Sequence, residues 1–180
     1  TRNYVMGLEI VLPDGEVMKV RRMARDIRKA LPNSIRLGSI TAGVAQCIEF
    51  IPTRTGGRYR AQDAVPGDGT GLDFAAPDQS FNMLGRNSDW PVDQRIVAND
   101  RVAVYNLGIA GDDAYAGDNT ANVSSVVDGT ETQINMLGNT TRFPLASGGN
   151  RFHVIPGNEE IVSYMCSGGK LYRNANYAYS

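Results

Sequence analysis

The feature that most constrains the fold is a change of hydrophobic period at Pro32. Residues 16–31 carry apolar side chains at spacings of three and four, with charged residues between them, which is the pattern of an amphipathic helix. Asp14 stands where an N-cap acceptor is wanted, and Pro32 disfavours helical geometry at the residue before it. We therefore expect a helix over residues 16–31. Its apolar face consists of Val17, Val20, Met23, Ile27 and Leu31.

The first 15 residues are expected to be a lead-in to this helix. Residues 5–12 are rich in apolar side chains, and Leu-Pro-Asp-Gly follows at positions 12–15. This pattern indicates a short strand or extended segment closed by a turn.

Beyond Pro32, short β-rich runs are separated by Gly, Pro, Asn and Asp, which predicts strands instead of further helices. Asp128-Gly129 and Ser167-Gly168-Gly169 each separate two such runs, so both pairs are expected to form antiparallel hairpins. Residues 65–92 are rich in Asp, Pro and Gly and are expected to form a long loop. The predicted strands are 47–51, 58–61, 101–106, 122–127, 131–136, 151–155, 161–166 and 170–173.

These elements predict an α+β fold in which an N-terminal amphipathic helix packs on an antiparallel sheet. A chain of 180 residues buries roughly 70% of its unfolded surface, enough for one core without metal ions or dense disulfides. We expect a single domain over residues 1–180, with a β-rich part from residue 35 onward. We interpret the long loop as part of this one domain and not as a linker between two domains, because neither flanking segment could form a hydrophobic core alone.

Composition excludes several classes of partner. The chain has 18 Lys and Arg against 19 Asp and Glu, a formal net charge of −1, so it offers no basic field for nucleic acid. No apolar run approaches the roughly 20 residues that cross a bilayer. The single histidine excludes His-rich zinc sites.

Candidate chemistry is sparse. The Asp- and Gly-rich loops at 67–73 and 111–119 offer oxygen ligands that suit Ca²⁺, but the same residues make turns unaided, so no metal site is assigned. His153 lies in an alternating run and is expected to face away from Phe152 and Val154. No nucleophile or carboxylate stands beside it in the sequence, so we predict no catalytic residue, no cofactor and no enzymatic activity.

The two cysteines leave two readings open. Cys47 and Cys166 lie too far apart in the chain for a CxxC pair or a zinc knuckle. Outside the cytoplasm they could form a disulfide that closes a long loop, and in the cytosol they would be two small buried hydrophobic side chains.

From residue 21 onward the chain resembles a known family through a series of segments in order. They include the Arg-Met-Ala-Arg-Asp-Ile-Arg-Lys-Ala-Leu-Pro-Asn-Ser run of the helix, the Gly-Gly-Arg-Tyr-Arg run and the Asn-Arg-Phe run. The family is the MshO-type minor pilins of MSHA pilus biogenesis, within the type IV pilin and type II secretion pseudopilin superfamily. The segments that carry the resemblance are 22–34, 47–53, 56–60, 101–108, 142–144, 149–152 and 162–166.

The resemblance implies a structural subunit that performs no reaction. An apolar N-terminal helix, absent from this fragment, would anchor the precursor in the inner membrane and then pack in the filament core. Residues 16–31 would be the end of that helix, and the remainder would be a pilin-like head in the periplasm or on the cell surface. The expected partners are other major and minor pilins of the same filament, and the extracytoplasmic setting favours a Cys47–Cys166 disulfide.

An alternative function belongs to a different class. The chain could be an extracellular β-rich module that binds surfaces or glycans, with Ca²⁺ as a cofactor of recognition. Its contact surface would be the Asp- and Gly-rich loops together with Trp90 and Pro91.

Overall fold

The structure is a computed structural model that describes residues 9–11, 17–19, 21–38, 47–138, 142–167 and 170–175. The described chain is mostly β, with one α-helix, α1 (Arg21–Arg28), and two single-turn 3₁₀ helices, η1 (Asn87–Asp89) and η2 (Val92–Gln94). The strands are β1 (Glu9–Val11), β2 (Val17–Lys19), β3 (Arg36–Leu37), β4 (Cys47–Phe50), β5 (Thr55–Arg58), β6 (Ser80–Met83), β7 (Arg101–Val104), β8 (Thr120–Val127), β9 (Thr132–Met136), β10 (Arg151–Ile155), β11 (Val162–Ser167) and β12 (Lys170–Ala175).

The larger sheet has six strands in the order β5-β10-β7-β8-β9-β6, and every neighbouring pair is antiparallel. Its two edge strands also meet, because Tyr59 forms a bridge with Met83. Two backbone hydrogen bonds of 2.8 Å, from Arg60 N to Asn82 O and from Leu84 N to Arg58 O, support that bridge. The sheet therefore curls until its edges touch.

The interior of this curled sheet is filled by alternate residues of its strands. In β9, Ile134 and Met136 are buried, and in β10 Phe152 and Val154 are, as the period of two requires. Phe81 of β6 meets Phe152 edge to face, with ring centroids 5.3 Å apart. The buried cluster comprises Tyr59, Leu72, Phe81, Met83, Ile96, Val102, Val104, Ala121, Val123, Ile134, Met136, Phe143, Phe152 and Val154.

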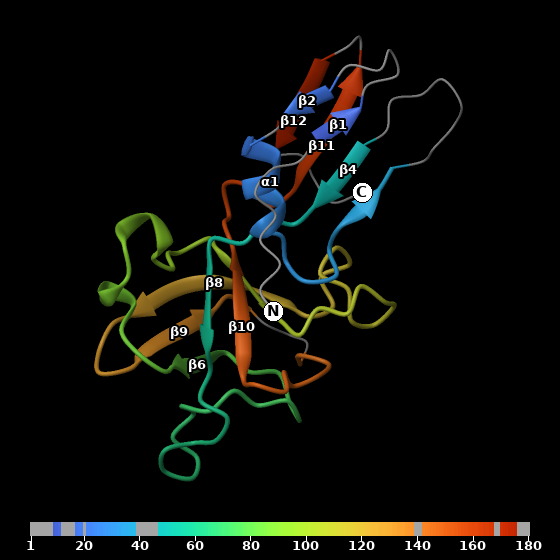
Figure 1. Cartoon of the computed structure of the whole chain (residues 1–180). Helices are drawn as coiled ribbons and strands as arrows, with labels where there is room; N and C mark the ends of the chain where they lie inside the picture. The colour runs from blue at the N-terminus through green and yellow to red at the C-terminus, as the bar shows by residue number, and fades with distance from the viewer. Residues whose placement is uncertain are drawn as a thin grey trace.

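The smaller sheet has four antiparallel strands in the order β12-β11-β4-β3. Figure 1 shows this sheet and α1 in the upper part of the molecule, with the six-stranded sheet below them. The hairpin of β1 and β2 forms a separate two-stranded sheet. Among the described residues, no helix has the length and hydropathy of a membrane span.

Within the described part of the chain, two segments cross from one sheet to the other, and we call them the crossovers. Residues 51–54 lead from β4 into β5, and residues 156–161 lead from β10 into β11 (Figure 1). Beside them lies a small apolar cluster of Leu31, Ile51, Ala103, Ala114 and Ile155. The second crossover lies close to the backbone that precedes β7, since a Cβ on Gly157 would collide with Asn99 O.

The predicted α+β class is wrong, because the described chain is built mainly from two antiparallel sheets and has a single short helix. The pattern after Pro32 favoured strands correctly, but it did not reveal that they divide between two sheets. Which strands pair depends on contacts between residues that are far apart in the sequence. Strands joined by a crossover, such as β4 and β5, follow one another in the chain but belong to different sheets.

The predicted helix over 16–31 is too long at both ends. Val17 lies in β2, paired with Val11, and the helix spans Arg21–Arg28. Leu31 follows the helix and donates its N–H to Ile51 O at 2.8 Å. Val20 lies outside the described residues. Val17 therefore matched the helical spacing by coincidence. A segment as short as β2, with three residues, is compatible with the period of a strand as well as with that of a helix.

Most predicted strands after residue 100 are confirmed within one or two residues, and β8 pairs antiparallel with β9 across Asp128-Gly129. The hairpin of β11 and β12 is also confirmed, although its turn at 168–169 lies outside the described residues. The strand expected at 58–61 is wrong by about three residues, since β5 ends at Arg58. The long loop at 65–92 contains β6 and η1. β3 was not predicted, and the Leu-Pro-Asp-Gly turn at 12–15 lies outside the described residues.

Candidate functional site

Helix α1 lies on the four-stranded sheet through two apolar side chains. Met23 is buried, with 5% of its surface exposed, in a cluster with Phe50 of β4 and with Val162 and Tyr164 of β11. Ile27, one helical turn later, packs against the same cluster while remaining partly exposed. Of the apolar face expected from the sequence, these two residues contact this sheet. Leu31 instead belongs to the cluster at the crossovers.

The side of α1 that faces solvent is basic. Arg22, Arg25, Arg28 and Lys29 are all exposed. Arg25 and Arg28 lie in the last turn, where a positive charge interacts favourably with the helix dipole. The helix therefore presents a cationic surface opposite its packed face.

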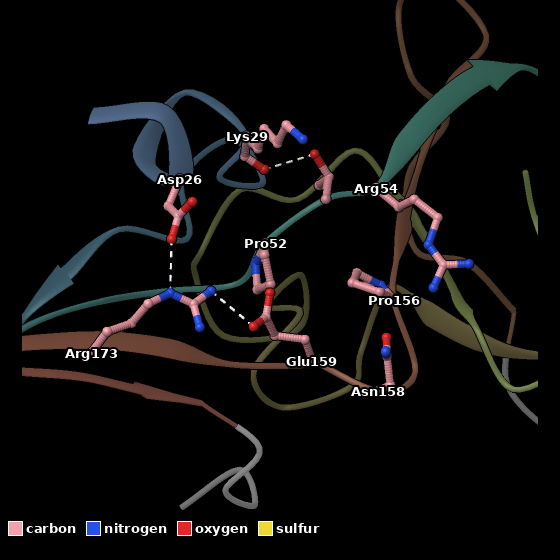
Figure 2. Close-up of a pocket in the computed structure, with 9 residues that line it drawn as sticks. Asp26, Lys29, Pro52, Arg54, Pro156, Asn158, Glu159 and Arg173 are labelled. Carbon is pink, nitrogen blue, oxygen red and sulfur yellow. Dashed lines mark hydrogen bonds and ion pairs between the residues drawn. The ribbon is translucent and has the colours of Figure 1, made fainter. Parts of the chain in front are cut away.

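Asp26 is the acidic exception on this helix, and it joins the helix to the sheet. Its Oδ2 accepts a hydrogen bond from the Tyr164 hydroxyl at 2.7 Å and another from Arg173 Nε at 2.8 Å. Arg173 of β12 also pairs through Nη2 with Glu159 Oε1 at 2.8 Å. Figure 2 shows Arg173 between the two carboxylates, one from the helix and one from the second crossover. We call Asp26, Tyr164, Arg173 and Glu159 the helix clamp.

The ionisation of the helix clamp follows from these contacts. Burial raises the pKa of Asp26, but the hydrogen bonds from Tyr164 and Arg173 and the charges of Arg173 and Arg22 lower it further, so the net pKa lies below 3.8. Burial and the Asp26 carboxylate raise the pKa of Tyr164 to about 12. Burial lowers the pKa of Arg173, yet its two carboxylate partners raise it above its ordinary value. At neutral pH the clamp is a charged and hydrogen-bonded joint.

A hollow of about 390 Å³ opens beside the clamp, between the end of α1, both crossovers and β12 (Figure 2). Thr53, one of its lining residues, binds the end of the helix, since its N–H and its hydroxyl each donate to Lys29 O at 2.7 Å. The charged groups Asp26, Glu159 and Arg173 bind one another. The residues that line the hollow are Asp26, Lys29, Pro52, Thr53, Arg54, Pro156, Asn158, Glu159 and Arg173.

Arg54, at the far side of this hollow, fixes the crossovers to the six-stranded sheet. Its Nη1 pairs at 3.1 Å with Oδ2 of Asp100, which is 1% exposed. Asp100 also accepts the N–H groups of Val97 at 3.0 Å and Gly157 at 3.2 Å. The buried carboxylate therefore has three partners, as a buried charge requires.

The first Asp-rich loop uses its carboxylates to shape its own backbone. Asp68 accepts hydrogen bonds from the N–H groups of Val65 and Thr70, and Asp63 accepts those of Gly67 and Gly71. These are turn-forming contacts of the kind that Asp makes in loops. Their oxygens are therefore already engaged.

The second Asp-rich loop contains a buried polar pair. Asn119 Nδ2 donates to Asp112 Oδ1 at 2.8 Å, and both residues are at least 97% buried. Within the described chain, Asp112 Oδ2 and Asn119 Oδ1 have no hydrogen-bond partner. Burial raises the pKa of Asp112, the bond from Asn119 lowers it, and the charges of Asp118 and Asp113 raise it, so the net pKa lies above 3.8. The described residues contain no group of three or more His, Cys, Asp or Glu placed to hold a metal ion.

The remaining candidates fall elsewhere. His153 lies in β10 opposite Gly56, on the face away from the buried Phe152 and Val154, as predicted. In the backbone register, Cys47 is paired with Met165, and Cys166 with Leu171. Cys166 is a free, partly buried cysteine in the structure. The side chain of Cys47 lies outside the described residues, so the disulfide is still only a prediction.

The helix clamp was not predicted from the sequence. Tyr164 and Arg173 lie 138 and 147 positions from Asp26 in the sequence. No local sequence pattern relates residues at such separations. The one available signal was a lone acid among five basic residues of the same helical stretch.

Comparisons of the chain with protein-family models, with curated proteins and with solved structures found no match.

We expect Asp26→Asn to destabilise the protein by roughly 1–3 kcal/mol at pH 7, because it removes charge-assisted hydrogen bonds from Tyr164 and Arg173. A carboxyl with a lowered folded-state pKa contributes stability above its ordinary pKa and loses it as pH falls through the folded value. The difference between Asp26→Asn and the natural chain should therefore shrink toward pH 2. Urea unfolding at several pH values measures it. The exposed Asp93→Asn is the matched control, and an equal effect of both variants would contradict the clamp.

We expect Asp112→Asn to have the opposite sign and to stabilise the protein at pH 7 by about 1 kcal/mol. The raised pKa means that Asp112 favours folding when protonated, and this contribution is lost as pH rises above 3.8 through the folded value. An amide keeps the acceptor for Asn119 Nδ2 and adds a donor without a buried charge. Thermal unfolding at pH 7 checks this, and a clear loss of stability would show instead that the carboxylate charge is needed, as a bound cation would require.

Proposed function

We propose that this chain is the head of a minor pilin or pseudopilin, a structural subunit that takes part in assembly or capping of a type IV, MSHA-like pilus. The role is mechanical and includes no reaction. The partners would be other major and minor pilins. The head would act outside the cytoplasm, and the full-length precursor would reside in the inner membrane.

The observation that carries the proposal is the helix clamp. A subunit that is attached to a filament through a helix must transmit force from that helix to its head. Apolar contact by Met23 and Ile27 alone would allow the helix to slide, because apolar contacts are not directional. The hydrogen bonds from Tyr164 and Arg173 to Asp26 fix the position of the helix along the sheet.

The segments that resemble the pilin family also support the proposal. Segment 22–34 contains most of α1 and the turn after it, segment 47–53 contains β4 and most of the first crossover, and segment 162–166 contains most of β11. These segments build the unit of helix and sheet that the clamp holds together. The proposal depends on α1 and the chain after it, since residues 17–19 are extended where the family implies helix.

Deleting the gene from the cell that produces this protein should lower the number of surface filaments severalfold, because a subunit that starts or caps assembly acts on every filament. Electron microscopy counts the filaments, and the natural gene should restore them. The protein should also be recovered with purified filaments or with the membrane-bound assembly complex. Unchanged filament numbers, together with absence of the protein from both fractions, would contradict the proposal.

Charge-neutralising variants sharpen this test. Arg25→Gln with Arg28→Gln changes the exposed basic side of α1, whereas Arg86→Gln changes an exposed arginine on the six-stranded part of the molecule. The helix variant should restore fewer filaments than the Arg86 control, while both retain the thermal stability of the natural chain within a few degrees. Equal restoration would remove the basic face of α1 from the proposal.

A further inference from the structure

The outer face of strands β5 and β10 gathers basic side chains around a glycine. In the antiparallel register, Arg151 is directly opposite Arg58, and His153 is directly opposite Gly56. Residues directly opposite in a sheet share a face. Phe152, between Arg151 and His153, points the other way into the buried cluster. One face of this strand pair therefore carries two arginines, one histidine and a glycine.

Gly56 leaves this face open beside His153, because it carries no side chain. A Cβ on Gly56 would stand 2.7 Å from Phe152 O and 3.4 Å from His153 Nδ1, so only glycine fits there without a shift of the backbone. The hollow beside Gly56 and His153 has a volume of about 410 Å³, within the range of small-molecule sites. Its lining consists of Thr53, Thr55, Gly56, Gly57, Arg58, Arg151, Phe152 and His153.

The charged residues that line this hollow, Arg58 and Arg151, are both positive. Its described lining contains no carboxylate, and two like charges directly opposite in a sheet destabilise the strand pair. Elsewhere, arginines of neighbouring strands or loops meet acids, as Arg60 meets Glu131 and Arg101 meets Glu160. Packing of the sheet does not require two arginines at this position, because both side chains are exposed.

His153 adds a half-buried donor to the same hollow. Burial and then the charge of Arg151 lower its pKa, so the imidazole is neutral at pH 7. On the same face of the sheet, Arg151 lies two residues along β10, Arg58 lies diagonally across in β5, and Arg101 lies diagonally across in β7, where it pairs with Glu160. The residue of β7 directly opposite His153 is the uncharged Ala103. An anion in the hollow would offset both arginine charges and favour the protonated ring.

We propose that this hollow binds an oxyanion, a carboxylate, sulfate or phosphate group, through the guanidinium groups of Arg58 and Arg151 with His153 as a further donor. Guanidinium groups match the geometry of such anions by paired N–H donors. The volume suits a group carried on a ligand the size of one sugar. This inference does not depend on the pilin proposal, because it uses neither α1 nor the helix clamp.

The test follows the His153 ring by NMR during titration of the intact chain with sodium sulfate, sodium glucuronate or neutral glucose, at ionic strength held constant with sodium chloride. Sulfate or glucuronate should shift the ring signals in a saturable way and raise the pKa of His153. Arg151→Gln and Arg58→Gln should each weaken binding at least tenfold, whereas Arg86→Gln should leave it unchanged. Gln keeps a polar side chain but removes the guanidinium charge, and because both positions are exposed, the substitutions should not impair folding.

The outcomes separate the sources of the anion. Tighter binding of glucuronate than of sulfate, with no response to glucose, would identify an acidic saccharide as the ligand. Equal binding of sulfate and glucuronate would identify the anionic group alone. Absence of a saturable shift with either anion, or equal affinity of Arg151→Gln and Arg86→Gln, would overturn the inference.

Discussion

The architecture depends on the two crossovers that the sheets share. Each is a few residues long, and each continues one strand of the six-stranded sheet into one strand of the four-stranded sheet. Leu31, Ile51 and Ile155 form a buried apolar cluster beside the crossovers. The Asp100 carboxylate binds the first crossover through Arg54 and the second through the N–H of Gly157. Because a buried carboxylate is costly without such partners, separating the crossovers would leave the Asp100 carboxylate with fewer partners and would also expose apolar surface. The two sheets are therefore coupled.

The helix is attached to this coupled body by interactions of two kinds. Met23 and Ile27 supply apolar burial, which holds the helix against the sheet without fixing its position. The Asp26 carboxylate supplies direction, since Tyr164 and Arg173 approach it from neighbouring strands. Beyond the helix, Leu31 and Thr53 pair with the opposite segment of backbone through hydrogen bonds to Ile51 O and Lys29 O. Force on α1 would pass to both sheets by this route, which is the mechanical property that the proposed filament role needs.

Local patterns predicted the strands well and the arrangement poorly, for identifiable reasons. Runs such as Thr132–Met136 and Arg151–Ile155 alternate between buried and more exposed side chains, so their period of two was visible in the sequence. Val17–Lys19 is too short to distinguish a strand from a helix, and β6 lies among the turn residues that predicted a loop. Strand order and the helix clamp rest on pairs separated by many tens of residues. The hollow beside Gly56 and His153 was equally hidden, because these two residues meet only through the register of β5 and β10.

Native-state hydrogen exchange tests the coupling of helix and sheets most directly. The amides of Leu31 and Thr53 join the helix end to the first crossover, and the amide of Val104, bonded to Asn119 O, reports on the six-stranded sheet. If the molecule is one mechanical unit, all three should exchange only through global unfolding, with the same free energy and the same dependence on denaturant. Exchange of Leu31 and Thr53 through a separate opening of much lower free energy than that of Val104 would contradict this account.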